Sequence, residues 1–292
     1  MELRVLNYFL AVAREENISR AAETLHITQP TLSRQLMQLE DELSTQLFVR
    51  GKNKMLLTNE GMLLRRRAQE MIDLAEKTKQ EFLWNEEVIA GVIDIGSGET
   101  YTMKRVAEVM KEFRDIYPQV TYHLYSGNAD DVKEKLDRGL IDIGLLTEPV
   151  DIEKYEFLRL PHKDIWGILM RKDHPLATKE YIEPYDLIHE DILCSHRDLI
   201  LKELEHWFGD VFQQIQIVST YNLIYNASLM VEAGMGMAIC FEKLININEN
   251  TNIVFKRLSP RLETGTVIVW KKHQVFSPAT THFLDMLKMY YK

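Results

Sequence analysis

The N-terminal part of the chain alternates apolar and polar residues with a helical period. A first helix is predicted by one apolar face, formed by Leu3, Leu6, Leu10 and Ala13. Ser19 is a candidate cap for a short second helix, and Thr28 for a third, in which Pro30 stands in the first turn. The third helix carries a narrow apolar stripe, made of Leu32, Leu36, Leu39 and Leu43. Two short helices joined by a brief link predict a helix-turn-helix.

Residues 47–58 predict a β-hairpin, because two apolar arms enclose a basic, turn-rich tip at residues 50–54. Such a hairpin beside a helix-turn-helix is a wing. Thr58 then caps a long helix that runs to about Trp84. This helix carries a coiled-coil seam, formed by Leu64, Ala68, Met71, Ala75, Thr78 and Phe82. A lone helix would expose this seam, so the pattern predicts dimerisation.

From Gly91 onward, the pattern changes to short apolar runs separated by helical stretches at residues 101–116 and 129–138. The runs with the composition of buried strands are VIDIG, TYHLY, DIGLL, IWGILM, DILC, IQIV, MAICF and TVIVW. Strands that alternate with helices indicate an α/β architecture with largely parallel sheets.

Charge is unevenly distributed along this chain of 292 residues, whose formal net charge is −9. Residues 1–67 carry ten Lys and Arg against eight Asp and Glu, a net of +2, so the remaining residues carry −11. A positive N-terminal module in an acidic chain is compatible with phosphate contact.

The sequence contains no recognisable signal for export or for a membrane. Its start has acidic residues and no long apolar run, so we expect no signal peptide. No stretch reaches the ~18 apolar residues of a membrane span. Cys194 and Cys240 are too few for a disulfide framework, which fits a reducing cytosol. We therefore expect a cytoplasmic protein.

The third helix has a polar face opposite its leucines, formed by Pro30, Thr31, Ser33, Arg34 and Gln38. Hydroxyls and amides can bond base edges, and Arg can bond phosphate or guanine, as a recognition helix requires. An ordinary solvated face would show the same residue types, and charged hairpin tips are commonly just solvated. The order of helix, helix-turn-helix, basic hairpin and dimerising helix favours DNA binding.

Residues 18–50 closely resemble the DNA-binding segment of the LysR-type family of transcriptional regulators. The resemblance is carried by the Ala-Ala pair, the Gln-Pro-x-Leu-Ser core, the Leu-Glu-x-x-Leu tail, Leu47-Phe48 and Leu57-Thr58-x-x-Gly61. It implies that bases are approached by Gln29, Pro30 and Ser33. The residues that it assigns to the DNA backbone are Thr31 and Arg34, and those that it assigns to the wing are Arg50 and Lys54.

Two positions depart from the family pattern. Ser44 stands where a glycine is usual, and Asn53 stands where the wing often has arginine. The second departure predicts a weaker contact with the minor groove.

The C-terminal half resembles the family's effector domain through Gly91 with VIDIG, then FRDIYPQV, LDRGLIDIGLL, KDHPLA and EAGMGMAI. The resemblance implies two α/β subdomains that are similar to periplasmic solute-binding proteins. We expect the chain to cross between them near Leu160–Lys163 and near Thr264–Val269.

The expected fold is therefore an α/β multidomain chain in three parts. A winged helix-turn-helix covers 1–58, a dimerising linker helix 59–87 and the effector domain 88–292. Within the effector domain, subdomain I comprises 88–161 and 269–292, and subdomain II comprises 162–268.

Ligands of open α/β sheets bind at the carboxyl ends of strands, where helix N-termini offer free N–H groups. Loops with suitable polar residues are Ser97-Gly98-Glu99-Thr100, Ser126-Gly127-Asn128, Thr147-Glu148, Ser195-His196 and Ser219-Thr220. The residues predicted to bind the effector are Ser97, Glu99, Thr100, Ser126, Thr147, Ser195, His196 and Thr220. Any single hydroxyl among them could instead cap a helix.

The chemistry of the effector stays open. Many relatives bind carboxylates or aromatic acids through such groups, but the anionic Glu99 would repel an anionic ligand unless its side chain points outward. An amine-bearing or neutral effector therefore also remains an alternative.

Cys194 introduces an alternative, because it lies near the reactive cysteine of the family's peroxide-sensing branch. That chemistry needs a thiol of lowered pKa and a resolving cysteine, yet Glu203 stands where such a partner is expected. A thiol-based redox sensor is therefore the second interpretation. A solute-binding protein comes further behind, because no signal peptide is expected and a DNA-reading segment precedes the domain. An enzyme is also disfavoured, because the sequence has no HExxH, nucleophile elbow, P-loop or dinucleotide motif.

We thus expect no enzyme, no metal and no cofactor. The expected partners are double-stranded DNA with an inverted repeat in a promoter, a small-molecule effector and further copies of the chain. The copies would form a dimer through the linker helix and further a tetramer. RNA polymerase is a further candidate, and a membrane is not.

Overall fold

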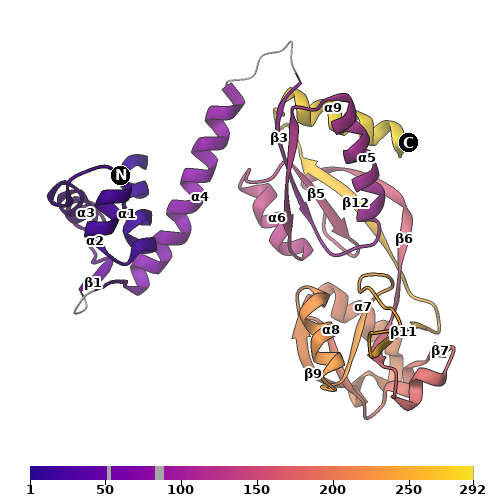
Figure 1. Ribbon diagram of the computed structural model, residues 1–292. Helices are drawn as coiled ribbons and strands as arrows, with labels where there is room; N and C mark the ends of the chain where they lie inside the picture. The colour runs from indigo at the N-terminus through magenta and orange to yellow at the C-terminus, as the bar shows by residue number, and fades with distance from the viewer. Residues whose placement is uncertain (51–53, 83–88, 292) are drawn as a thin grey trace. The chain divides into compact units, whose positions relative to one another are not determined.

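The computed structural model describes residues 1–50, 54–82 and 89–291 (Figure 1). The chain divides into two compact units, Met1–Leu83 and Trp84–Lys292. Asn53, which stands where the family's wing often has arginine, and Trp84, the predicted end of the long helix, lie outside the described residues.

The first unit is a helical head with a small hairpin. Its elements are α1 (Leu3–Glu15), α2 (Ile18–Thr24), α3 (Gln29–Leu43), β1 (Phe48–Arg50), β2 (Met55–Leu57) and α4 (Asn59–Phe82). The strands β1 and β2 pair antiparallel, so the predicted wing is confirmed. Buried side chains of α1, α2 and α3 form one core with Leu47 and Phe48.

Capping residues set the helix starts in the head. Thr28 caps α3 as predicted, since its hydroxyl accepts from the N–H of Thr31 at 3.4 Å. The prediction for α2 was wrong by two residues: Asn17 is the cap, and its side chain accepts from the N–H groups of Ser19 and Arg20. An Asn side chain at this position satisfies donors that would otherwise have no partner.

The apolar stripe of α3 is buried over its first three members only. Leu32, Leu36 and Leu39 are at most 4% exposed, whereas Leu43 is 38% exposed at the end of the helix. The last turn of α3 therefore extends beyond the core of the head.

Glu40 and Gly61 hold the first arm of the wing against the helices. The carboxylate of Glu40 in α3 accepts from the N–H groups of Leu47 and Phe48 at 2.7 and 3.2 Å. Gly61 in α4 lies so close to the Leu47 carbonyl that an added Cβ would be 2.2 Å from the oxygen. Only glycine permits this approach without displacement.

The predicted seam of α4 serves the head itself. Ala68 is fully buried in the core of the head, and Leu64 and Met71 pack against the same core. The exposed leucines of α4 are instead Leu63 and Leu74, which are 55% and 43% exposed. At Leu64, Ala68 and Met71, the predicted seam is therefore a contact of α4 with the head of the same chain.

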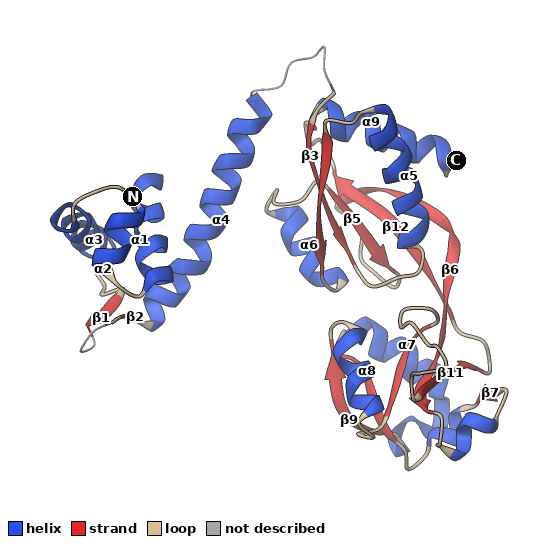
Figure 2. Cartoon of the chain, viewed as in Figure 1, coloured by secondary structure: helices blue, strands red, loops and turns tan. Residues whose placement is uncertain are grey.

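The second unit contains two mixed sheets that share one long strand (Figure 2). Its strands are β3 (Gly91–Ser97), β4 (Val120–Ser126), β5 (Ile143–Thr147), β6 (Tyr155–Arg171), β7 (Tyr181–Ile182), β8 (Asp191–Ser195), β9 (Gln216–Tyr221), β10 (Met237–Phe241), β11 (Ile253–Leu258) and β12 (Glu263–Lys271). Its helices are α5 (Met103–Ile116), α6 (Ala129–Asp137), α7 (Asp198–Phe208), α8 (Ile224–Glu232), α9 (Pro278–Tyr290) and the short 3-10 turns η1 (Pro175–Thr178), η2 (Pro184–Leu187) and η3 (Gly209–Gln214).

Subdomain I, as the structure forms it, is built on the order β4-β3-β5-β12-β6. The strands β3, β4 and β5 run parallel, with Gly91 opposite Val120 and Ser97 opposite Ser126, while β12 is antiparallel to β5 and β6. Helices α5 and α9 pack in one apolar cluster of this sheet and α6 packs in another. The predicted α/β class is confirmed, with antiparallel strands where the chain crosses.

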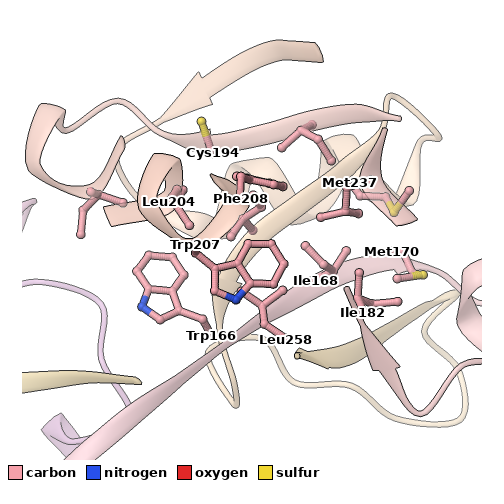
Figure 3. Close-up of a cluster of buried hydrophobic side chains, with 14 of the residues drawn as sticks. Trp166, Ile168, Met170, Ile182, Cys194, Leu204, Trp207, Phe208, Met237 and Leu258 are labelled. Atoms are coloured by element: carbon pink, nitrogen blue, oxygen red, sulfur yellow. The ribbon is translucent and has the colours of Figure 1, made fainter. Parts of the chain in front are cut away.

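Subdomain II uses the C-terminal half of β6 in a second sheet. Here β8 runs parallel to β9 and β10, and β6 is antiparallel to β10 and β11. Its main core gathers buried side chains from β6, β8, β10 and α7 (Figure 3), including Trp166, Ile168, Cys194, Leu204, Trp207 and Met237.

Both crossovers lie a few residues from the predicted places. On β6 the pairing passes from Glu263, opposite Ile165, to Phe241, opposite Trp166. The return segment lies between the end of β11 at Leu258 and the start of β12 at Glu263. The first crossing is made by the continuous strand β6, so apolar periodicity has no break there that would mark the change of sheet, whereas the return is the short connection between β11 and β12.

Candidate DNA-reading face and effector cleft

The polar face of α3 is directed to solvent. Gln29, Pro30, Arg34 and Gln38 are exposed, and Thr31 and Ser33 are partly exposed. Two side chains are ordered by neighbours: the hydroxyls of Thr28 and Thr31 lie 2.8 Å apart, and Gln35 Nε2 donates to Gln38 Oε1 at 3.0 Å. The face presents hydroxyl, amide and guanidinium groups side by side.

Lys54 of the wing is paired within the head. Its Nζ lies 2.7 Å from Glu16 Oε2, and this bond lowers the pKa of the Glu16 carboxyl. The carbonyl of Glu16 also accepts from the N–H of Met55 at 2.8 Å. Glu16 therefore ties the end of α1 to the wing. Arg50 is the last residue of β1.

A cleft opens between the two subdomains of the second unit. It encloses about 520 Å³ of empty space, part of it open to solvent. Residues that follow β3 and β4 and the last residue of β5 contribute from subdomain I, and residues at the ends of β8 and β9 contribute from subdomain II. These are carboxyl ends of parallel strands, where ligand sites of α/β sheets form. The apolar part of the lining is Trp166, Ile200, Phe241 and Leu244.

Three of the eight predicted effector residues line this cleft: Glu99, Thr147 and Ser195. The other five do not. Ser126 and Thr220 are exposed outside the lining. Burial and hydrogen bonding of hydroxyls depend on distant parts of the chain, so spacing alone could not separate the two groups.

The remaining three predicted residues make local or supporting contacts. The hydroxyl of Ser97 donates to the carbonyl of Gly98 at 2.7 Å. His196 is exposed, with Nε2 3.4 Å from Asn128 Nδ2 and Nδ1 3.1 Å from the carbonyl of Tyr221. Thr100 is buried and its hydroxyl bonds to the carboxylate of Asp164.

Asp164 anchors the loop that follows β3. Its carboxylate also accepts from the N–H of Tyr101 at 3.0 Å and lies 3.4 Å from the hydroxyls of Thr102 and Thr266. The side chain is 4% exposed, so a network of this kind is needed to offset the cost of burying the charge. It fixes the loop from which Glu99 reaches the cleft.

Arg197 is the main functional candidate that sequence reasoning missed. It is 5% exposed, lines the cleft and stands at the start of α7. Its Nε lies 3.3 Å from Asp130 Oδ2, and its Nη2 donates to the carbonyl of Pro149 at 3.1 Å. Both partners belong to subdomain I, so Arg197 links the two subdomains. The available signal was a cation directly after the predicted Ser195-His196 loop.

Glu99 also links the subdomains, and it does not point outward. Its Oε2 accepts from the N–H of Ile224, the first residue of α8. Burial raises the pKa of the Glu99 carboxyl, and the bond to Ile224 opposes that rise. The first loop of the cleft thus carries a half-buried carboxylate directed at a helix N-terminus.

Both cysteines are buried in subdomain II. Burial raises the pKa of the Cys194 thiol to about 11, and burial followed by the Glu99 charge raises the pKa of the Cys240 thiol. The thiolate is the form that reacts with oxidants, so these surroundings disfavour the thiol-sensing alternative. Within the described ranges, no group of three or more His, Cys, Asp or Glu could hold a metal ion.

The helices described here include none that is both long enough and apolar enough to cross a bilayer.

Two family descriptions match this chain. "Bacterial regulatory helix-turn-helix protein, lysR family" matches residues 3–62, and "LysR substrate binding domain" matches residues 86–292. The chain is similar to the HTH-type transcriptional regulator YvbU of Bacillus subtilis (strain 168), at 28% identity over 99% of this chain and 98% of that protein. It is also similar to the Hca operon transcriptional activator HcaR of Escherichia coli (strain K12), at 28% identity over 99% and 97%.

The fold is similar to that of full-length CbnR, solved as a complex with its target DNA. The TM-score is 0.76 at 20% identity, over 99% of both chains. A winged helix-turn-helix head followed by a two-subdomain substrate-binding domain defines a transcriptional regulator. The chain belongs to the LysR family of these regulators, as the resemblance in the sequence implied.

Proposed function

We propose that this chain binds an inverted repeat in promoter DNA as a dimer, and that a small molecule in the cleft alters this binding. The observation that carries the proposal is the division of α3 into two faces. Leu32, Leu36 and Leu39 are buried in the head, while the opposite face is polar and exposed. A helix of this kind can enter the major groove.

We assign the contacts as the family resemblance implies. Gln29, Pro30 and Ser33 approach base edges, while Thr31 and Arg34 hold the backbone beside Gln38. Arg50 and Lys54 serve the wing. Lys54 must then exchange its bond to Glu16 for a phosphate, which lowers its net contribution because an existing ion pair is lost.

The dimer is assigned to α4. Leu63 and Leu74 are eleven residues apart in the sequence, close to three helical turns, so they lie on one face. Both are exposed, and burial against a second α4 would remove this apolar surface from water. Two-fold pairing matches the symmetry of an inverted repeat. Association to a tetramer, contact with RNA polymerase and a cytoplasmic location belong to the same proposal.

The regulatory step is a population shift between arrangements of the two subdomains. Contacts already cross the cleft at Arg197–Asp130, Asn128–His196 and Glu99–Ile224. An effector that binds one arrangement more tightly favours it, and the change reaches the paired heads. The proposal includes no catalytic step, metal or cofactor.

A mobility-shift assay with the DNA upstream of the chain's own gene tests this function. We expect retardation of that DNA at lower protein concentration than an unrelated fragment of equal length. Raising salt from about 50 to about 200 mM should weaken binding by roughly 10³-fold, because phosphate contacts release counterions. Equal affinity for both fragments, or salt-independent binding, would contradict the proposal.

A further inference from the structure

The N-terminus of α8 is capped from the other subdomain. Its own N-cap residue, Leu223, provides no side-chain hydrogen bond, and the N–H of Ile224 donates to Glu99 instead. Helix N-termini attract anions because their N–H groups and dipole favour negative charge. In this protein a carboxylate of the chain itself therefore occupies the anion position at one wall of the cleft.

The charge of Glu99 is poorly compensated. Its side chain is half-buried. Burial is the main cause that raises the pKa of Tyr221 and Cys240, which also line the cleft, and the negative charge of Glu99 adds to the rise. Arg197 is a cation in the lining, but it already bonds Asp130 and the carbonyl of Pro149 in subdomain I. Among the described residues, no cation forms an ion pair with Glu99, whose recorded partner is the N–H of Ile224.

Further carboxylates stand beside the same cleft. Glu148 directly follows the lining residue Thr147, and its charge, after burial, raises the pKa of Glu203 in α7. The Oε2 atom of Glu203 is buried and has no hydrogen-bond partner among the described residues. Glu148 is paired with Arg159, whose Nε lies 3.2 Å from its Oε1, so Glu203 is the acidic group here that has a buried oxygen without a partner among the described residues.

The rest of the lining suits an apolar body. Trp166, Ile200, Phe241 and Leu244 supply aromatic and aliphatic surface, and about 520 Å³ of space accommodates a small organic molecule.

We propose that Glu99 makes this cleft select a small aromatic amine, with its ammonium group against the Glu99 carboxylate and its ring against Trp166 and Phe241, over the corresponding acid. The inference rests on the proposed role of the cleft as an effector site. A ligand carboxylate at α8 would have to displace Glu99, and the two like charges would then share a half-buried space. A ligand ammonium instead supplies the missing positive charge and leaves the cap on α8 in place.

The test uses the full-length chain and two probes of similar size and opposite charge, 2-phenylethylamine and 3-phenylpropanoate. Affinities are measured by calorimetric titration at neutral pH, and thermal shifts provide a second readout. We expect the amine to bind the unmodified chain at least ~10-fold more tightly than the acid. Such a ratio corresponds to about 1.4 kcal/mol.

Glu99→Gln is the matched variant, because an amide oxygen can still accept from the N–H of Ile224 without carrying a charge. This variant should bind the amine roughly 10-fold more weakly, and its preference for the amine over the acid should fall by the same factor. Glu99→Ser should free the N-terminus of α8 and increase affinity for the acid. Glu205→Gln removes an exposed carboxylate of α7 outside the lining and should leave the preference unchanged.

Three results would overturn the inference: tighter binding of the acid to the unmodified chain, an unchanged preference in Glu99→Gln, or binding of neither probe at millimolar concentration. If Glu99→Gln does not fold, the preference of the unmodified chain still decides the matter. DNA binding is measured on the same samples. If the unmodified chain binds its DNA but shows no preference for the amine, this inference alone is refuted. If the unmodified chain does not bind its DNA specifically, the proposed function is refuted.

Discussion

Ser44 ends α3 with a φ of 51°, in the left-handed region that side chains with a Cβ disfavour. Its backbone N–H bonds back to carbonyls of the last turn, which is the usual role of a glycine at a helix C-terminus. The sequence marked this position as a departure from the family pattern, and the backbone angle explains why glycine is usual there.

Ser44→Gly should therefore stabilise the head. Relief of the left-handed strain exceeds the added chain entropy of the unfolded state, so we expect the free energy of unfolding to rise by about 0.5 kcal/mol. Denaturant titration of the full-length chain measures it. Glu23→Gly, on the exposed face of α2, is the control and should destabilise instead.

Substitutions of Ser33 and Arg34 should have different effects, because Ser33 is assigned to base edges and Arg34 to the DNA backbone. Ser33→Ala should cost about 1 kcal/mol of discrimination between the specific site and its single-base variants. Arg34→Ala should weaken binding to all sequences alike and reduce the salt slope by about 1. Mobility shifts over a salt series measure both quantities. An altered base preference in Arg34→Ala would show that the two roles are assigned wrongly.

The buried thiols should resist modification in the folded chain. Because burial raises the pKa of Cys194 to about 11, its thiol stays protonated at pH 8, and thiolate forms only as the pH approaches that value. We expect a disulfide reagent to label neither Cys194 nor Cys240 at pH 8 until denaturant is added. Rapid labelling of Cys194 in the native protein, or its oxidation by peroxide with a change in DNA binding, would revive the thiol sensor.

At the scale of elements, the junction of wing and α4 is built around the carbonyl of Leu47. Gly61 approaches the carbonyl of Leu47, and the N–H of Thr58 donates to the same carbonyl at 3.0 Å. The motif Leu57-Thr58-x-x-Gly61, recognised in the sequence, therefore serves to pack the start of α4 against the first arm of the hairpin.

Gly61→Ala should destabilise the head by about 2 kcal/mol, since the added methyl meets backbone that cannot move freely. The thermal or denaturant midpoint of the full-length chain measures this change. Asn59→Ala, an exposed position in the same turn, should change stability by less than about 0.5 kcal/mol. Equal effects at both positions would show that the contact is relaxed.

The elements themselves were largely predictable, with β6 as the instructive exception. Its C-terminal half was recognised as the apolar run IWGILM, but its first half contains Glu156, Arg159 and other polar residues. The strand is held there by β12 rather than by burial, so apolar periodicity could not reveal it. The short β7 and the partly exposed β11 escaped for the same reason.

At the scale of the whole molecule, α4 is the element through which copies of the chain are proposed to meet. Leu64, Ala68 and Met71 are occupied by the head of the same chain. Leu63 and Leu74 remain for a partner.

Leu63→Glu and Leu74→Glu should each shift the protein toward monomer, because a buried carboxylate without a partner is costly in an apolar contact. Light scattering coupled to size exclusion measures the mass. In a mobility-shift assay, each variant should bind an inverted repeat more weakly than the unmodified chain does. Gln69→Glu, exposed on another face of α4, should leave the mass unchanged. A dimer that survives both leucine substitutions would place the interface elsewhere.

The sequence by itself determined the head, the α/β class and the family, because these follow from local spacing: leucines on one helix face, caps, and a dense motif over residues 18–50. Which polar residues meet in the cleft was decided by the tertiary structure. Glu99 bonds Ile224, and Arg197 bonds Asp130, across 125 and 67 positions of the chain. Side chains so far apart acquire their partners, burial and pKa only when the strands bring them together, and no periodicity along the chain records that meeting.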